Sequence, residues 1–171
     1  MDLRALIRDI PDFPKPGIVF LDITPLLGNA QGFRHAIDTM AERFQELGAT
    51  KVVCAEARGF IFGAALAYKM GLGFVPVRKP GKLPYKTASV TYDLEYGTDT
   101  LCVHEDALLR GEKVLVIDDV LATGGTLKGM LQLMEQFGAE VAAIGVLIEL
   151  NFLNGRDKLN GLPLDSIIQV G

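Results

Sequence analysis

Helical and strand-like patterns of apolar residues follow one another along this chain. Between residues 31 and 47, apolar side chains recur three or four positions apart, which predicts an amphipathic helix over Gln31–Leu47 that stops at Gly48. A second helix is predicted over Gly59–Met70, ending at Gly71. The third predicted helix presents one apolar face made of Leu127, Met130, Leu131 and Met134.

Short apolar runs predict the strands between these helices. Val114–Ile117 is continuously apolar and rich in β-branched residues, as expected of a parallel strand that is buried on both faces. The other predicted strands are Lys51–Ala55, Gly73–Val77, Thr87–Leu94, Thr98–His104, Glu140–Ile148 and Leu164–Val170, with a turn at Gly97. Because strands and helices alternate, we predict an α/β fold with a mainly parallel central sheet flanked by helices.

The N-terminal segment Pro11–Leu27 differs from the rest of the chain because prolines punctuate it. Its four prolines forbid a long helix and disfavour pairing in the middle of a sheet; they are Pro11, Pro14, Pro16 and Pro25. We expect a rigid, irregular flap over about residues 11–27. Taken alone, such a flap would simply cover an edge of the sheet.

Length and charge narrow the class of protein. The 171 residues fit a single domain spanning 1–171, and the net charge of −4 argues against binding nucleic acid through a broadly basic surface. No apolar stretch approaches the roughly 20 residues that span a bilayer, and Met1–Arg4 does not begin a signal peptide. Cys54 and Cys102 show neither a disulfide framework nor metal-ligand spacing. We therefore expect a cytoplasmic protein that binds neither nucleic acid nor membrane, with both thiols reduced and buried.

The strongest chemical signal directly follows Val114–Ile117. Asp118 and Asp119 come where this strand should end, and a small-residue turn at 122–126 then leads into a helix. A glycine-rich turn at a helix N-terminus directs several backbone N–H groups and the positive end of the helix dipole at one point, which suits a phosphate. The two acids beside it could hold hydroxyls or a metal. The glycine patterns of nucleoside triphosphatases and dinucleotide-binding proteins are both absent.

The segment from Val114 to Thr126 resembles the phosphoribosyl pyrophosphate signature of type I phosphoribosyltransferases. Four further parts of the chain join it in resembling the adenine phosphoribosyltransferase family; they are Pro11–Pro25, Glu56–Gly59, Arg78–Lys82 and Tyr92–Gly97. The resemblance covers nearly the whole chain. It implies the type I phosphoribosyltransferase fold, with the flap as a hood and a mobile lid loop over about residues 78–96. It also implies purine salvage, in which adenine and phosphoribosyl pyrophosphate give AMP and pyrophosphate.

The resemblance further implies which residues hold the sugar phosphate. Asp118 and Asp119 would accept hydrogen bonds from the ribose hydroxyls, and the 5′-phosphate would be bound by Ala122, Thr123, Gly124, Gly125 and Thr126. Pyrophosphate would be bound by Glu56, Ala57, Arg58, Gly59, Arg78, Lys79 and Lys82, with a cis peptide expected between Glu56 and Ala57. Mg²⁺ is the implied cofactor, held mainly by the substrate and water, with few or no protein side chains as its metal ligands.

Adenine recognition and catalysis are implied in the same way. The adenine-binding residues would be Val19, Phe20, Leu21 and Leu153, with the backbone of Val19 and Leu21 matching the 6-amino group and N1. Leu21 departs from the family pattern, since many members carry arginine there. The implied catalytic residues are Glu95 for proton transfer, Arg58 for the charge of the leaving group, and Tyr96 as a shield of the reacting centre.

Two other functions stay open from the sequence alone. One is a non-catalytic regulator that senses phosphoribosyl pyrophosphate, although the chain shows neither an added DNA-binding domain nor a large basic face. The other is a phosphoribosyltransferase for a 6-oxopurine or xanthine, which the adenine-type flap disfavours but Leu21 leaves open. The family is typically homodimeric, so a homodimer is expected as well.

Overall fold

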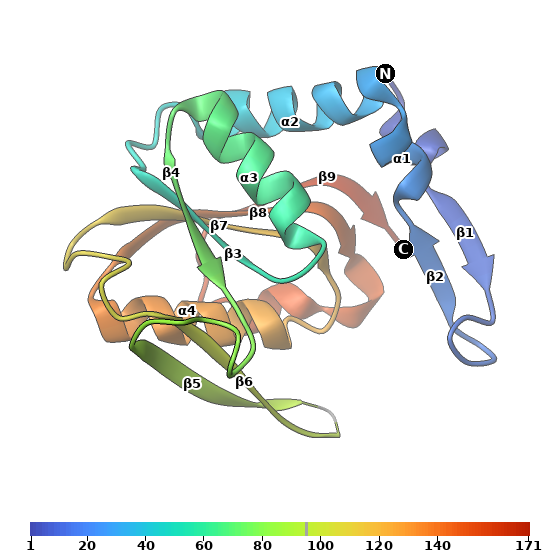
Figure 1. Ribbon diagram of the computed structural model, residues 1–171. Coiled ribbons are helices and arrows are strands. Elements are labelled where there is room, and N and C mark those ends of the chain that lie inside the picture. Colours follow the sequence, from blue (N-terminus) through green and yellow to red (C-terminus); the bar gives the residue numbers. More distant parts are fainter. Residues whose placement is uncertain (95) are drawn as a thin grey trace.

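A five-stranded parallel sheet forms the centre of the computed structural model, which describes residues 1–94 and 96–171 (Figure 1). The strands, in spatial order, are β4 (Gly73–Val77), β3 (Lys51–Ala55), β7 (Lys113–Leu121), β8 (Glu140–Leu150) and β9 (Leu164–Val170). All neighbouring pairs run parallel. The central strand β7 is the predicted apolar run, and each residue from Val114 to Ile117 is fully buried. The predicted α/β architecture is therefore confirmed.

Helices cover both faces of this sheet. Successive residues of β7 point to opposite faces. Leu115 and Ile117 accordingly join the core beneath α2 (Ala30–Phe44) and α3 (Gly59–Met70). Val114 and Val116 join the core beneath α4 (Gly125–Phe137). None of these helices, and no other helix in the described part of the chain, is long and apolar enough to cross a membrane.

Two antiparallel hairpins extend beyond the central sheet (Figure 1). The first joins β5 (Thr87–Leu94) to β6 (Gly97–His104), as predicted to within one residue, and lies beside α4. Tyr92 of this hairpin packs so closely on α4 that a Cβ added to Gly129 would lie 2.8 Å from its ring. Cys54 and Cys102 are both buried free cysteines, as expected.

The second hairpin corrects the prediction of an irregular flap. Strands β1 (Arg8–Pro11) and β2 (Val19–Asp22) pair in register, and the helix α1 (Thr24–Gly28) follows. The prolines sit where regular structure tolerates them: one at the end of β1, two in the connecting turn and one in the first turn of α1. The remaining short elements are the 3-10 helices η1 (Leu3–Leu6), η2 (Asn151–Leu153) and η3 (Gly155–Lys158).

Strand β7 is longer than predicted, which changes the setting of the two acids. It continues to Leu121, so Asp118 and Asp119 lie within the strand and not after its end. The reason is that β8 offers a long apolar partner, whose residues Val146 and Ile148 stand opposite Asp118 and Val120. Pairing with β3 stops at Ile117, so the acids lie beside the loop that follows β3.

Candidate active site

A cleft of about 600 Å³ opens at the carboxyl ends of β3 and β7, the edge at which open parallel sheets bind ligands. It collects residues from the hairpin β1–β2, from the loop after β3, from the end of β7 and from the segment after β8. The residues that line it are Ile18, Val19, Phe20, Leu21, Glu56, Ala57, Arg58, Gly59, Asp118, Asp119, Val120, Ala122, Thr126, Leu150 and Leu153. All four predicted adenine-binding residues thus share one cleft with both acids and with Arg58.

The two adjacent carboxylates concentrate negative charge in this cleft. Asp119 is buried, and its Oδ2 lies 2.8 Å from Nε of Arg58. Asp118 accepts a hydrogen bond of 2.9 Å from the N–H of Asp119. Burial, together with the charge of Asp119, raises the pKa of Asp118 well above the usual carboxyl range. A ligand whose hydroxyl groups donate hydrogen bonds, or one that brings positive charge, would stabilise the charged form of Asp118.

The loop after β3 approaches the acids unusually closely. A Cβ added to Gly59 would lie 2.7 Å from Oδ1 of Asp118 and 2.9 Å from Sγ of Cys54, so glycine is required there. The guanidinium carbon of Arg58 stands 5.3 Å from the centre of the Phe20 ring, which is cation–π distance. The peptide bond between Glu56 and Ala57 is cis, as predicted. Arg58 therefore connects the hairpin β1–β2 to the acid pair.

The predicted basic loop adjoins the cleft through Glu56. Glu56 accepts a hydrogen bond of 2.7 Å from the N–H of Lys79, and its carboxylate lies 3.4 Å from Nε of Arg78. The ammonium group of Lys79 pairs with Asp99 of β6, and this hydrogen bond lowers the pKa of Asp99. Among the described residues, Arg78, Lys79 and Lys82 do not contribute to the cleft lining.

The turn predicted to bind phosphate packs backbone against backbone. Ala122 and Thr126 line the cleft, whereas Thr123 and Gly125 line an adjoining cavity of about 490 Å³. Gly124 has a φ of +88°, and a Cβ added to it would lie 2.7 Å from the carbonyl oxygen of Gly155. A Cβ on Gly155 would in turn lie 2.5 Å from the carbonyl oxygen of Ala122. The segment after β8 therefore supports the turn directly.

Two of the predicted catalytic residues, Glu95 and Tyr96, stay predictions. Glu95 lies outside the described residues, and Tyr96 is 90% exposed. Conversely, the sequence analysis missed Ile18, Val120 and Leu150 as lining residues. Ile18 and Val120 each adjoin a predicted site residue, so extending those segments by one position would have included them. Leu150 ends a long apolar strand and carries no signal of its own.

Comparison with known proteins agrees with the site. The family model described as phosphoribosyl transferase domain matches residues 23–163. Adenine phosphoribosyltransferase of Solidesulfovibrio magneticus is 74% identical to the chain over 170 residues, which are 99% of each protein. The crystal structure of adenine phosphoribosyltransferase from Thermoanaerobacter pseudethanolicus has a TM-score of 0.95 at 50% identity and covers 99% of this chain and 98% of its own.

The enzyme from Saccharomyces cerevisiae extends the comparison to a liganded structure. It was solved in complex with D-2,5-dideoxy-2,5-imino-altritol 1,6-bisphosphate and adenine, and has a TM-score of 0.91 at 38% identity, covering 97% of this chain and 96% of its own. The likeness in fold therefore extends over nearly all of both chains. On these matches, the chain belongs to the adenine phosphoribosyltransferases, within the family of the type I phosphoribosyltransferase fold.

Proposed function

We propose that this chain transfers the 5-phosphoribosyl group of phosphoribosyl pyrophosphate to adenine, forming AMP and pyrophosphate in purine salvage. The observation that carries this function is the single cleft in which Val19–Leu21 and Leu153 face Arg58 and the acid pair. Relatives that match this chain over nearly their whole length are named adenine phosphoribosyltransferase, which supports the same reaction here. In the reaction, N9 of adenine bonds to C1′ of the ribose, pyrophosphate leaves with the electron pair of the broken C1′–O bond, and a proton is lost from the base.

The acid pair is proposed to hold the ribose. Asp118 and Asp119 would accept hydrogen bonds from the 2′- and 3′-hydroxyls, each bond contributing about 1.5–3 kcal/mol because the acceptor is charged. The raised pKa of Asp118, caused by its burial and by the charge of Asp119, supports this role, since hydroxyl donors would stabilise its charged form. Carboxylate charge also stabilises the oxocarbenium-like transition state of glycosyl transfer. The turn Ala122–Thr126 is proposed to bind the 5′-phosphate through its backbone N–H groups.

The loop after β3 is proposed to bind the leaving pyrophosphate. Ala57, Arg58 and Gly59 line the cleft, where the Arg58 guanidinium and the backbone N–H groups of this loop would stabilise the negative charge that develops on the leaving group. Arg78, Lys79 and Lys82 would join them when the lid closes and excludes water from the activated sugar. This closure requires Lys79 to exchange Asp99 for a phosphate oxygen.

Strand β2 is proposed to select adenine through its backbone. Within the described part of the chain, β2 pairs only with β1, so its other edge can offer N–H and C=O groups to a base. Pro11, which has no N–H, stands opposite Val19 and cannot donate to its carbonyl oxygen. A carbonyl at Val19 and an N–H at Leu21 would match the 6-amino group and N1 of adenine. The 6-oxopurines reverse that pattern and leave polar groups unpaired.

Mg²⁺ is the proposed cofactor, and the donor set in the cleft fits it. The described residues contain no group of three or more His, Cys, Asp or Glu side chains that could enclose a metal ion. Asp118 and Asp119 offer carboxylate oxygens, which suit an ion that binds one or two carboxylates and otherwise water and substrate phosphates. When bound, Mg²⁺ neutralises charge on the pyrophosphate. Glu95 and Tyr96 stay proposed for proton transfer and for shielding the reacting centre.

We further propose a single-domain subunit, residues 1–171, that acts as a homodimer in the cytoplasm. Ile61 and Tyr68 support dimer formation, because they lie seven residues apart on one side of α3 and are 38% and 91% exposed. The two buried free cysteines fit a reducing compartment. Neither nucleic acid nor membrane is a proposed partner. Light scattering of the purified protein measures the subunit number directly.

A base-competition assay tests the proposed reaction. The purified protein is incubated with Mg²⁺, phosphoribosyl pyrophosphate and equal amounts of adenine, hypoxanthine, guanine and xanthine, and nucleotides are separated by chromatography. We expect AMP alone, and its loss when a chelator is added. Nucleotide from a 6-oxopurine would refute the selection of adenine by β2. Binding of phosphoribosyl pyrophosphate without any nucleotide would indicate a regulator.

A further inference from the structure

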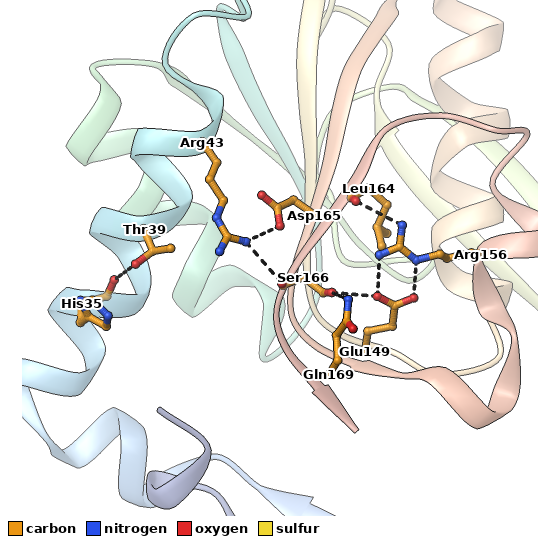
Figure 2. A network of polar contacts seen from close by, with 9 residues as sticks. All are labelled: His35, Thr39, Arg43, Glu149, Arg156, Leu164, Asp165, Ser166 and Gln169. Carbon is orange, nitrogen blue, oxygen red and sulfur yellow. Dashed lines mark hydrogen bonds and ion pairs between the residues drawn. The ribbon is translucent and has the colours of Figure 1, made fainter. Parts of the chain in front are cut away.

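An ion pair between the buried carboxylate of Glu149 and the half-exposed Arg156 joins the two ends of the chain segment that follows β8 (Figure 2). Glu149 is 4% exposed, and its two carboxylate oxygens accept hydrogen bonds from Nε and Nη2 of Arg156, at 2.5 and 2.8 Å. The hydroxyl of Ser166 in β9 donates to the same carboxylate at 2.8 Å. Arg156 also donates to the carbonyl oxygen of Leu164, at 3.3 Å. These contacts tie both ends of the segment 150–155 to the sheet.

The segment 150–155 contacts both the proposed adenine pocket and the turn proposed to bind the 5′-phosphate. Leu150 and Leu153 line the cleft, and Leu153 also lines the cavity beside the phosphate turn. Gly155 lies against the backbone of Gly124 and Ala122, which belong to that turn. A shift of this segment would therefore displace the side of the adenine pocket and the support of the 5′-phosphate turn together.

Besides the ion pair, the segment is held by the pairing of Leu150 with Val170 and by the contact of Gly155 with the turn, while the residues between them are loosely packed. It contains only the short 3-10 helix η2, and Phe152 and Leu153 are 62% and 39% exposed, so apolar burial contributes modestly. A bidentate pair between a guanidinium and a carboxylate combines strong hydrogen bonds with a fixed planar geometry. Hydrogen bonding to Arg156 also holds the pKa of Glu149 below its usual range, so the carboxylate stays charged at neutral pH.

We propose that Glu149 and Arg156 are positioning residues that set the geometry of the adenine pocket and the 5′-phosphate turn at once. Neither side chain lines the cleft among the described residues, so the pair acts through Leu153 and Gly155. The inference rests on the proposed function of the cleft. The affinities for adenine and for phosphoribosyl pyrophosphate would then both depend on one ion pair that lies outside the cleft.

A second ion pair, which like the first contacts β9, provides a control. Arg43 of α2 pairs with Asp165 of β9 and donates to the carbonyl oxygen of Ser166 at 3.3 Å (Figure 2). Its side chain is 41% exposed, close to the 47% of Arg156. Both pairs thus fasten β9, but only Arg156 holds the segment beside the cleft. Arg43→Lys therefore reproduces the loss of an arginine that contacts β9 without disturbing that segment.

Steady-state kinetics of Arg156→Lys, Glu149→Gln and Arg43→Lys test the proposal, with thermal melts of each variant. We expect the KM values for adenine and for phosphoribosyl pyrophosphate to rise together by about tenfold in the first two variants, the scale of one charge-assisted hydrogen bond. In Arg43→Lys both values should stay within about twofold of the wild type, a change of under 0.5 kcal/mol. A fourth variant, Arg156→Leu, should lose more affinity for both substrates than Arg156→Lys. Lysine keeps the positive charge, although it cannot form the bidentate pair.

Three results would overturn the proposal. They are unchanged KM values in a folded variant without the pair, an equal rise in Arg43→Lys, and failure of both Arg156→Lys and Glu149→Gln to fold. The last would make the pair a support of the whole sheet and not of one segment. Wild-type protein that forms no AMP would instead refute the function of the cleft, so the two failures are distinguishable.

Discussion

Replacing Gly124 by alanine tests whether the phosphate turn depends on its close contact with Gly155. The φ of +88° makes any residue with a Cβ costly there, by about 1–2 kcal/mol. For a chain of this length, that strain lowers the melting temperature by about 2–8 °C, since each kcal/mol shifts it by about 2–4 °C. The new Cβ would also lie 2.7 Å from the carbonyl oxygen of Gly155. Because a backbone atom cannot simply rotate away, the turn itself must move.

Movement of the turn should appear as lost affinity for phosphoribosyl pyrophosphate. Each backbone hydrogen bond to a charged phosphate contributes about 1.5–3 kcal/mol, so losing one raises KM about 10- to 150-fold. We expect kcat to change less, because the 5′-phosphate is bound in both the ground state and the transition state. Steady-state kinetics at varied phosphoribosyl pyrophosphate and saturating adenine measure the two constants separately.

Gly111→Ala separates backbone strain from the contact with Gly155. Its φ of +79° carries the same type of strain, but a Cβ there would meet no described atom within 4 Å. Gly111 lies between β6 and β7, away from the residues that line the cleft. Both variants should melt at lower temperature, and only Gly124→Ala should bind phosphoribosyl pyrophosphate more weakly. A KM equal to that of Gly111→Ala would refute the support of the turn by Gly155.

Three further substitutions probe the other parts of the cleft. Arg58→Gln should lower kcat about 10- to 150-fold at saturating substrates, because it removes a charged donor to the leaving pyrophosphate, and an unchanged kcat would contradict that role. Asp118→Asn should raise the melting temperature of the substrate-free protein, increasingly as pH rises above the usual carboxyl range. The reason is that the raised pKa of Asp118 makes its ionisation oppose folding. Melts across pH check this sign, and a constant difference would contradict it. Leu153→Ala should raise the KM for adenine about 5- to 30-fold through about 1–2 kcal/mol of lost apolar contact, and an unaltered KM would exclude Leu153 from the adenine pocket.

Local patterns predicted most of the strands well. The strands β3, β4, β5 and β9 have the predicted bounds, because β-branched runs bounded by glycine or polar residues mark strand ends clearly. The helix α2 ends at Phe44 and not at Leu47, although Leu47 still packs against the core from the following turn. Apolar periodicity reports which side chains are buried, and it cannot tell whether the backbone that carries the last of them is still helical.

The cleft residues were predictable where a motif lies next to a strand end, and less so where distant segments meet. The contact between Gly124 and Gly155 joins positions far apart in the sequence, and no periodicity encodes how closely two backbones approach. The same holds for the pair of Glu149 and Arg156, whose residue types look like ordinary surface charges in the sequence. For Lys79, the resemblance implied pyrophosphate binding, but its partner Asp99 depends on the pairing of β5 with β6.

The hairpin β1–β2 forms a sheet separate from the one that carries the acid pair and the phosphate turn. The match to the general family begins at Ile23, directly after β2 ends at Asp22. The hairpin residues proposed to bind adenine thus precede the matched region, whereas the residues proposed to bind the activated sugar lie within it. Leu153 is the proposed adenine-binding residue that lies inside the matched region. A change of acceptor base can therefore begin in the N-terminal hairpin, outside the matched region, while the residues proposed to bind the sugar stay unchanged.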